Sequence, residues 1–304
     1  MGAEVYSNVS YWLALSSVTG VGPKRARVLA KRFGSVRNVF SADIIDISII
    51  LGGNIYLARE ILNVGQDIDK HQKFSQNLRK NGIQTLCPED TEYPDLLASI
   101  DNPSPVLYRI GKALENNRLS IAIVGTRSPT REGREIAECL AGQLSTRGLT
   151  IVSGLAKGID TAAHKGTLKA GGKTIAVLGS GLKMIYPEQN IELARKICKD
   201  GTVLSECHPN EVVSSKGLMQ RNRIISGLSH GVVLIEPKMG AMNTAKWACR
   251  QNRHIFIYKN QKTVDLSLPL SYNSVCFESD QLDMIHKKLQ TLKDTNKQME
   301  FIQD

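Results

Sequence analysis

From residue 119 onward, short apolar runs alternate with longer amphipathic stretches. The runs predict strands over 119–125, 149–155, 173–181, 202–206, 231–237 and 254–259. Between the first two runs, Ile136, Leu140 and Leu144 repeat at the spacing of one helix face. The strand runs are apolar throughout, which is typical of parallel strands covered on both faces. The pattern predicts an α/β domain over 119–270 with a Rossmann-like, doubly wound, mainly parallel sheet.

Different patterns flank this domain. Residues 1–85 predict a small all-α domain. Residues 86–118 contain four prolines, so we expect an irregular connector packed on the sheet domain. The remaining residues, 271–304, predict one strand near 274–278 and a polar helix from Asp280.

A sharp local signal lies at residues 18–34. Gly20 and Gly22 flank Val21, and Pro23 then stands at a favoured first helical position. Glycines at a helix N-terminus leave backbone N–H groups open to a phosphate. The segment resembles the helix-hairpin-helix family, whose members bind the phosphate backbone of DNA without reading its sequence. The resemblance implies that residues 1–85 form a helix-hairpin-helix or SAM-like domain. Together with Gly20 and Gly22, Lys24 and Arg25 are the candidate residues for contact with the DNA backbone. Alternatively, the hairpin docks to a protein.

Small and cationic residues gather where the predicted strands end, which is where open α/β sheets bind ligands. Several separated cations suit an extended polyanion better than a single nucleotide. The planar guanidinium of arginine, with its parallel N–H donors, matches the oxygens of a phosphate. Alternatively, the arginines pair with carboxylates such as Glu206 or Glu236. The candidate DNA-binding residues are Gly125, Thr126, Arg127, Ser128, Ser153, Gly154, Lys157, Gly179, Ser180, Lys183, Arg221, Asn222 and Arg223.

The charge balance favours the same class of partner. Lys and Arg number 39 against 29 acidic residues, which gives a net charge of +10. Such a balance favours nucleic acid or, less often, a membrane surface. No apolar run is long enough to span a bilayer and the start does not read as a secretory signal, so we expect a cytoplasmic protein without membrane partners.

Three other chemistries find little support. The segment 171–174 ends like a phosphate-binding loop, but Thr167 stands where that loop needs glycine. Asp160 and His164 share a helix face, which a helix-surface pair or a helix N-terminal aspartate explains as well as acid/base catalysis does. Six scattered cysteines lack metal-ligand spacing. We therefore expect no catalytic residues, no metal and no cofactor.

One family carries several of these motifs in order. The stretches "IAIVGTRSPTREG", "TIVSGLAKGIDTAAHKGTLKAGGKTIAVLGSGLKMIYPEQN" and "QRNRIISGLS" resemble the DNA-processing protein family DprA, also called Smf. The resemblance implies a non-catalytic homodimer, joined through the Rossmann-like domain. It binds single-stranded DNA, protects incoming strands during natural transformation and helps to load a RecA-type recombinase. The implied pocket comprises Gly125, Arg127, Ser153, Gly154 and Lys157, with Gly179, Arg221 and Arg223 nearby.

The sequence departs from this family pattern in three places. Leu218, Met219 and Gln220 replace a Phe-Pro-Arg run, which removes one cation. Met239 to Met242 replace a more polar loop, and the residues after Pro269 are too few for the winged-helix domain of many members. A phosphoribohydrolase-like Rossmann enzyme is an alternative, although its glycine-rich loop is missing from 236–248. A nucleotide sensor is another.

Overall fold

The computed structural model describes residues 6–259 and 274–291, and it divides the chain into two compact units, 1–110 and 111–304. Residues 86–110, most of the expected connector, fall in the same unit as the helices. The finer division expected from the sequence stays a prediction. Of the expected tail, 271–273 and 292–304 lie outside the described residues, and 282–291 are helical.

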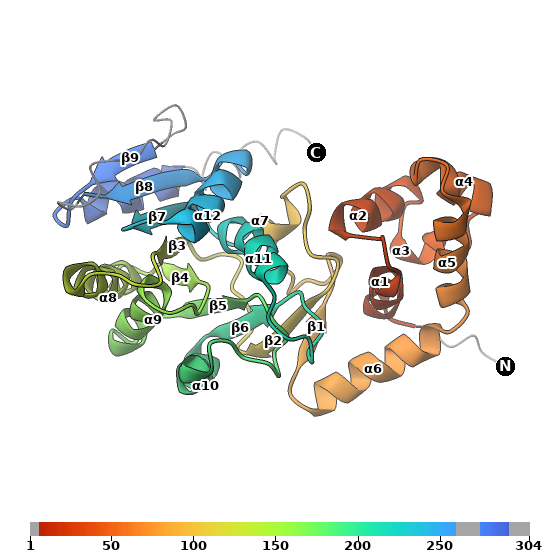
Figure 1. Ribbon diagram of the computed structural model, residues 1–304, viewed down its shortest axis with the longest axis horizontal. Coiled ribbons are helices and arrows are strands. Elements are labelled where there is room, and N and C mark those ends of the chain that lie inside the picture. The colour runs from red at the N-terminus through yellow and green to blue at the C-terminus, as the bar shows by residue number, and fades with distance from the viewer. Residues whose placement is uncertain (1–5, 260–273, 292–304) are drawn as a thin grey trace. The chain divides into compact units, whose positions relative to one another are not determined.

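The first unit is mainly helical (Figure 1). Its two short strands, β1 (Gln84–Leu86) and β2 (Leu107–Gly111), pair antiparallel, with Thr85 opposite Tyr108. The helices are α1 (Asn8–Ser17), α2 (Pro23–Arg32), α3 (Val36–Val39), α4 (Ile44–Ile50), α5 (Ile55–Gly65), α6 (Ile68–Lys80) and α7 (Asp95–Ala98).

The predicted hairpin joins α1 to α2. Gly20 takes a φ of +97°, a conformation that glycine adopts at little cost, and Pro23 stands at the first position of α2. The face of α2 that carries Ala26, Leu29 and Ala30 is buried in this unit. The sequence pattern over 18–34 therefore predicted the local structure correctly.

In the described part of the second unit, seven parallel strands follow the order β6-β5-β4-β3-β7-β8-β9. The chain moves outward from β3 to β6, then returns to the other side of β3. This reversal confirms the doubly wound, Rossmann-like sheet and puts its switch point between β3 and β7. The strands are β3 (Ser120–Gly125), β4 (Thr150–Ser153), β5 (Thr174–Leu178), β6 (Thr202–Ser205), β7 (Gly231–Ile235), β8 (His254–Tyr258) and β9 (Ser274–Phe277).

Helices connect these strands and bury their apolar side chains. Leu140 and Leu144 of α8 pack in one core cluster with Ile121, Ile151 and Phe256 of the sheet. Figure 1 shows α11 and α12 side by side, apart from α8 and α9. The connecting helices are α8 (Arg131–Thr146), α9 (Ile159–Lys169), the 3-10 turn η1 (Glu188–Asn190), α10 (Ile191–Asp200), α11 (Ser215–Gly227) and α12 (Met239–Arg250).

One sequence-based interpretation is wrong at the end of β7. Met239 to Met242 are not a loop, because α12 already begins at Met239. Lys238 precedes that helix with extended backbone and supplies no side-chain cap. The first backbone N–H groups of α12 therefore receive no cap from the residue that precedes the helix.

Candidate functional site

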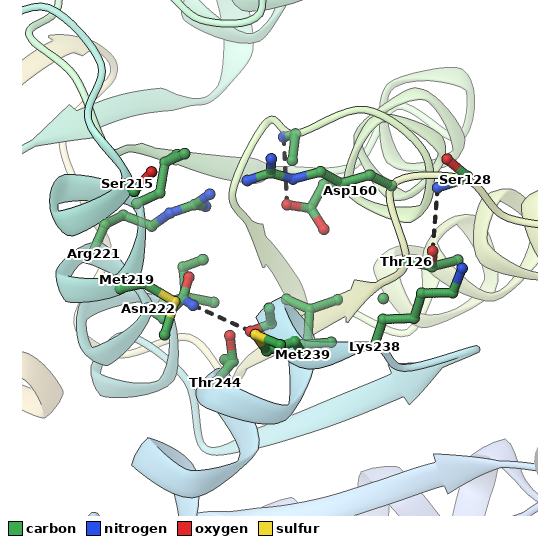
Figure 2. Close-up of a pocket in the computed structure, with 18 residues that line it drawn as sticks. Thr126, Ser128, Asp160, Ser215, Met219, Arg221, Asn222, Lys238, Met239 and Thr244 are labelled. Atoms are coloured by element: carbon green, nitrogen blue, oxygen red, sulfur yellow. Dashed lines mark hydrogen bonds between the residues drawn. The ribbon is translucent and has the colours of Figure 1, made fainter.

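A pocket of about 440 Å³ opens at the switch point between β3 and β7. Its walls come from the end of β3 and the residues after it, the start of α9, α11 from Ser215 to Ile225 and the first turns of α12 (Figure 2). Six of the predicted binding residues line it, namely Gly125, Thr126, Arg127, Ser128, Arg221 and Asn222. The strand order brings them together, since their segments are far apart in the sequence.

Two exposed cations stand at the mouth of this pocket. Arg127 follows β3, and Lys238 follows β7 on the neighbouring strand. Within the described residues, neither side chain forms an ion pair with a carboxylate. Charges that are free of protein partners are available to an anionic ligand.

A third cation, Arg221, lies at the buried side of the pocket. Its guanidinium donates a 3.2 Å hydrogen bond to the Val177 carbonyl, and its Nε has no partner in the part of the chain that the structure describes. The guanidinium packs directly against Gly154, where an added Cβ would lie 1.3 Å from Nη1. The close approach of this guanidinium to the backbone therefore requires glycine at position 154.

Asp160 is the one carboxylate among the described residues that lines the pocket. It accepts hydrogen bonds from the backbone N–H groups of Gly154 at 3.2 Å and Ala156 at 3.4 Å. Burial raises the pKa of Asp160, while the charge of Arg221 and these N–H donors lower it. Asp160 and His164 are both buried, so they are not a helix-surface pair. Asp160 lies in the first turn of α9, which confirms the other explanation, a helix N-terminal aspartate.

The electrostatics of the pocket favour an anion. Burial lowers the pKa of the Arg221 guanidinium, Asp160 opposes this change, and the like charge of Arg127 adds to it. Arginine nevertheless stays protonated in proteins. Arg127, Arg221 and Lys238 against Asp160 give a formal charge of 3 − 1 = +2 when the carboxylate is ionised. A phosphate between the cations would relieve their mutual repulsion.

Asn222 fixes two of the walls relative to each other. Its amide donates to the Gly240 carbonyl at 3.2 Å (Figure 2) and to Asn243 Oδ1 at 3.1 Å. These bonds tie α11 to the start of α12. On the opposite wall, the Ser128 backbone N–H donates to Thr126 Oγ1 at 3.2 Å. Asn222 and Thr126 therefore shape the pocket while their own side chains stay mostly buried.

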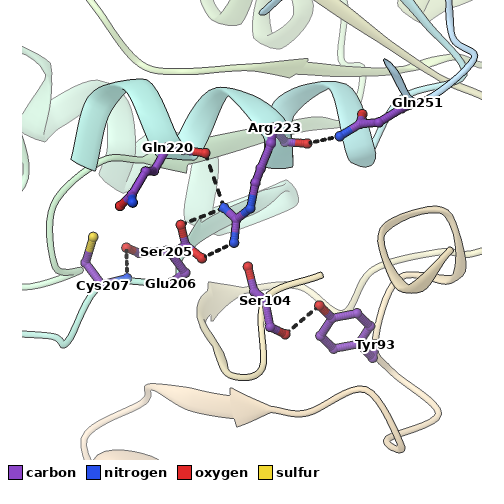
Figure 3. A network of polar contacts seen from close by, with 8 residues as sticks. All are labelled: Tyr93, Ser104, Ser205, Glu206, Cys207, Gln220, Arg223 and Gln251. Atoms are coloured by element: carbon purple, nitrogen blue, oxygen red, sulfur yellow. Dashed lines mark hydrogen bonds and ion pairs between the residues drawn. The ribbon is translucent and has the colours of Figure 1, made fainter. Parts of the chain in front are cut away.

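Arg223 pairs with a carboxylate, which is the alternative to phosphate binding that the sequence left open. Its two terminal nitrogens donate to the two carboxylate oxygens of Glu206, at 2.7 and 2.5 Å (Figure 3). Only 4% of the Arg223 side chain is exposed, and it is not part of the pocket wall. Glu236, the other suggested partner, instead accepts from the backbone N–H of Thr130 at 2.9 Å and from its hydroxyl.

The other predicted residues surround the pocket without lining it. The Ser153 hydroxyl donates to the Ile123 carbonyl at 2.7 Å and is fully buried. Gly179 lies against the backbone of Leu218, and Ser180 is buried as well. Lys157 and Lys183 are exposed on the segments that follow β4 and β5. Of this group, the two lysines are the residues that could reach a ligand extending beyond the pocket.

The hairpin candidates in the first unit lie on an accessible turn. Lys24 and Arg25 are exposed, and no described atom lies within 4 Å of a Cβ placed on Gly22. Arg25 donates to the Gly20 carbonyl at 2.7 Å, which closes the turn. DNA contact by this hairpin stays a prediction.

Several pocket residues were missed as candidates, among them Ser215, Met219, Lys238, Met239 and Thr244. The sequence already puts the segment after the fifth predicted strand at the ligand-binding edge. What the sequence lacks is the strand order, which puts β7 directly beside β3. Among the described residues, we find neither a three-residue cluster suited to a metal ion nor a helix that could cross a membrane.

Together, the fold and pocket define a class: Rossmann-like α/β proteins with a cationic pocket at the switch point. Comparison with known proteins identifies the family. Residues 84–299 match the model of the family "DNA recombination-mediator protein A". This match covers more than half of the chain, and the chain therefore belongs to that family.

The relatives agree with this assignment. Protein Smf of Synechocystis is 39% identical over 264 residues, which cover 85% of this chain and 66% of that protein. The chain thus spans just under two thirds of that curated relative. The crystal structure of DNA processing protein A from Streptococcus pneumoniae has a TM-score of 0.73 at 32% identity, covering 91% of this chain and 97% of that one. The protein of the same name from Helicobacter pylori, whose structure is described for its single-stranded DNA binding mode, has a TM-score of 0.54 at 25% identity, covering 71% and 96%.

Proposed function

We propose that this protein binds single-stranded DNA, with a backbone phosphate held between Arg127, Arg221 and Lys238. The observation that carries the proposal is the pocket at the switch point, with two exposed cations at its mouth and a third cation buried behind them. The Helicobacter pylori relative has a single-stranded DNA binding mode, which supports the same ligand here. Lys157 and Lys183 would contact the strand further along, because both are exposed on neighbouring strand-end segments.

Binding of this kind supports a role as a non-catalytic mediator in the cytoplasm. The protein would protect exposed or incoming strands and assist the loading of a RecA-type recombinase, as a homodimer joined through the second unit. The family's description as a recombination mediator supports this role. Incubation with AMP tests the non-catalytic part, since release of free adenine would instead indicate a phosphoribohydrolase.

Substitution of Arg127 tests the DNA-binding role. We expect Arg127→Ala to weaken binding of a labelled single-stranded oligonucleotide at least tenfold, in line with the removal of a charged hydrogen-bonding partner. The salt dependence of log K should also become shallower by about 0.7 for each phosphate that the variant no longer neutralises. Fluorescence anisotropy at several salt concentrations measures both quantities.

Arg195→Ala is the matched control, because Arg195 is an exposed arginine of α10 outside the pocket and its removal changes the net charge equally. This variant should bind like the wild type. Equal affinity of Arg127→Ala and the wild type would refute the proposed pocket. A wild-type protein with no affinity for single strands at low salt would refute the function itself.

A further inference from the structure

Two exposed methionines flank the cationic pocket. In the described part of the second unit, five large apolar side chains are exposed: Met184, Tyr186, Val212, Met219 and Met239. Met219 and Met239 line the pocket, and they are 42% and 83% exposed. Exposed apolar side chains that line a ligand site offer a surface that a bound ligand can cover.

The two methionines come from different helices that are held in a defined arrangement. Met219 lies in α11 one turn before Asn222, and Met239 begins α12 next to Gly240. The hydrogen bonds from Asn222 to Gly240 and Asn243 join these helix segments. Figure 2 shows both thioethers beside Asn222, on the same side of the pocket. Their spacing is therefore set by rigid elements, while each flexible side chain adapts to what it contacts.

We propose that Met219 and Met239 form an apolar contact for the nucleobase of the nucleotide whose phosphate occupies the pocket. Thioether sulfur interacts favourably with aromatic rings, and a base offers an aromatic face of either purine or pyrimidine kind. The cations next to the methionines attract the phosphate, so the attached base is brought to the apolar side. This inference rests on the proposed function and assigns the recognition of the base to two residues outside the predicted site.

The chemistry of a thioether contact leads to two expectations, one about sequence discrimination and one about an aromatic substitution. A thioether offers no strong hydrogen-bond donor or acceptor, so it holds a base without reading its edge. Discrimination between sequences should be weak, with larger purine faces bound somewhat more tightly. An aromatic side chain at 239 would give the base a better stacking surface than the thioether does.

The experiment compares a mixed-sequence oligonucleotide with an abasic strand of equal length and charge. We expect Met219→Ala/Met239→Ala to bind the normal strand about three- to tenfold more weakly and the abasic strand as the wild type does. Met239→Phe should bind the normal strand at least as tightly as the wild type, again without change on the abasic strand. Ile49→Ala is the matched control, since Ile49 is 67% exposed in α4 of the first unit and lies outside the segments proposed to contact DNA.

The outcomes separate this inference from the proposed function. If Arg127→Ala weakens binding of both strands while the methionine variant equals the wild type on the normal strand, the phosphate site stands and the base contact is refuted. Equal losses on both strands in the methionine variant would also refute it, because they would indicate damage to the phosphate site. A loss of the same size in Ile49→Ala would refute it too, since the effect would not be particular to the pocket. If the wild type binds neither strand, the proposed function itself fails.

Discussion

At the scale of single residues, the arginines show how similar sequence signals lead to different roles. Arg127, Arg221 and Arg223 are all candidate phosphate ligands in the sequence. In the structure, Arg127 is exposed at the pocket, Arg221 is buried behind it, and Arg223 is committed to Glu206. The difference follows from what each side chain meets after folding, because a buried guanidinium must have polar partners whereas an exposed one is solvated.

Gly154 gives a prediction at this scale. A methyl group at this position would overlap the Arg221 guanidinium, which would have to move away and give up its hydrogen bond to the Val177 carbonyl. We expect Gly154→Ala to lower the free energy of unfolding by about 2 kcal/mol, or the melting temperature by about 4 to 8 °C. Thermal unfolding followed by circular dichroism measures this shift.

Gly240→Ala provides the comparison, since a Cβ there meets no described atom within 4 Å and the residue lies inside a helix. Its melting temperature should stay unchanged or rise slightly. A normal melting temperature for Gly154→Ala would contradict the packing of Arg221 against this glycine.

At the scale of elements, the pocket depends on how strand ends are attached to helix starts. Glu236 follows β7 with a φ of +42°, and its carboxylate accepts from Thr130, the N-cap of α8. The Thr130 hydroxyl also accepts from the Gly133 backbone N–H at 2.9 Å. This small network connects the segments after β3 and β7, which carry Arg127 and Lys238 respectively. The positions of both cations therefore depend on a contact between two elements.

Thr130→Val tests this connection. The substitution removes a helix cap and one donor to Glu236, so we expect a decrease of about 1 to 2 kcal/mol in unfolding free energy. Because the segment after β3 is also loosened, affinity for single-stranded DNA should fall. Chemical denaturation and anisotropy report the two effects separately.

Thr146→Val makes the same chemical change at the exposed end of α8. It should alter stability by less than about 0.5 kcal/mol, as is usual for surface positions. If both valine variants behaved alike, the Thr130–Glu236 contact would have no particular importance.

At the scale of the whole molecule, a buried histidine couples folding to pH. His164 lies in α9, fully buried, with Nδ1 2.7 Å from the Thr174 hydroxyl oxygen and with Nε2 unpartnered among the described residues. Burial, together with the charge of Arg221, lowers the pKa of His164 from 6.5 to about 3. Between these two values the unfolded chain binds a proton that the folded chain does not, so stability rises with pH across this range.

We therefore expect the melting temperature to fall as the pH is lowered from 6.5 toward 3. His164→Leu should reduce this dependence without a decrease in stability at neutral pH, because Thr174 keeps its hydrogen bond to the Ile151 carbonyl. Asp160 acts in the opposite direction, since its raised pKa favours the folded state at low pH. Calorimetry of both proteins over this pH range measures the difference, and parallel curves would exclude His164 as the cause.

The sequence by itself determined what depends on local pattern. Continuous apolar runs indicated parallel strands, Gly20 and Pro23 indicated the hairpin turn, and the strand-end segments indicated where a ligand would bind. Apolar periodicity and turn-forming residues act through neighbours along the chain, so the strands and the hairpin turn were predictable, whereas the ligand-binding place stays a prediction.

Only the tertiary structure decided which of these residues form one site. The strand order put β7 beside β3, brought Lys238, Met219 and Met239 to the pocket, and left Ser153 and Gly179 behind its wall. It also decided that Arg223 is neutralised by Glu206 while Arg127 stays available. Strand order and ion pairing are contacts between distant parts of the chain. No local pattern specifies them, because each residue meets its partner only after the strands and helices have assembled.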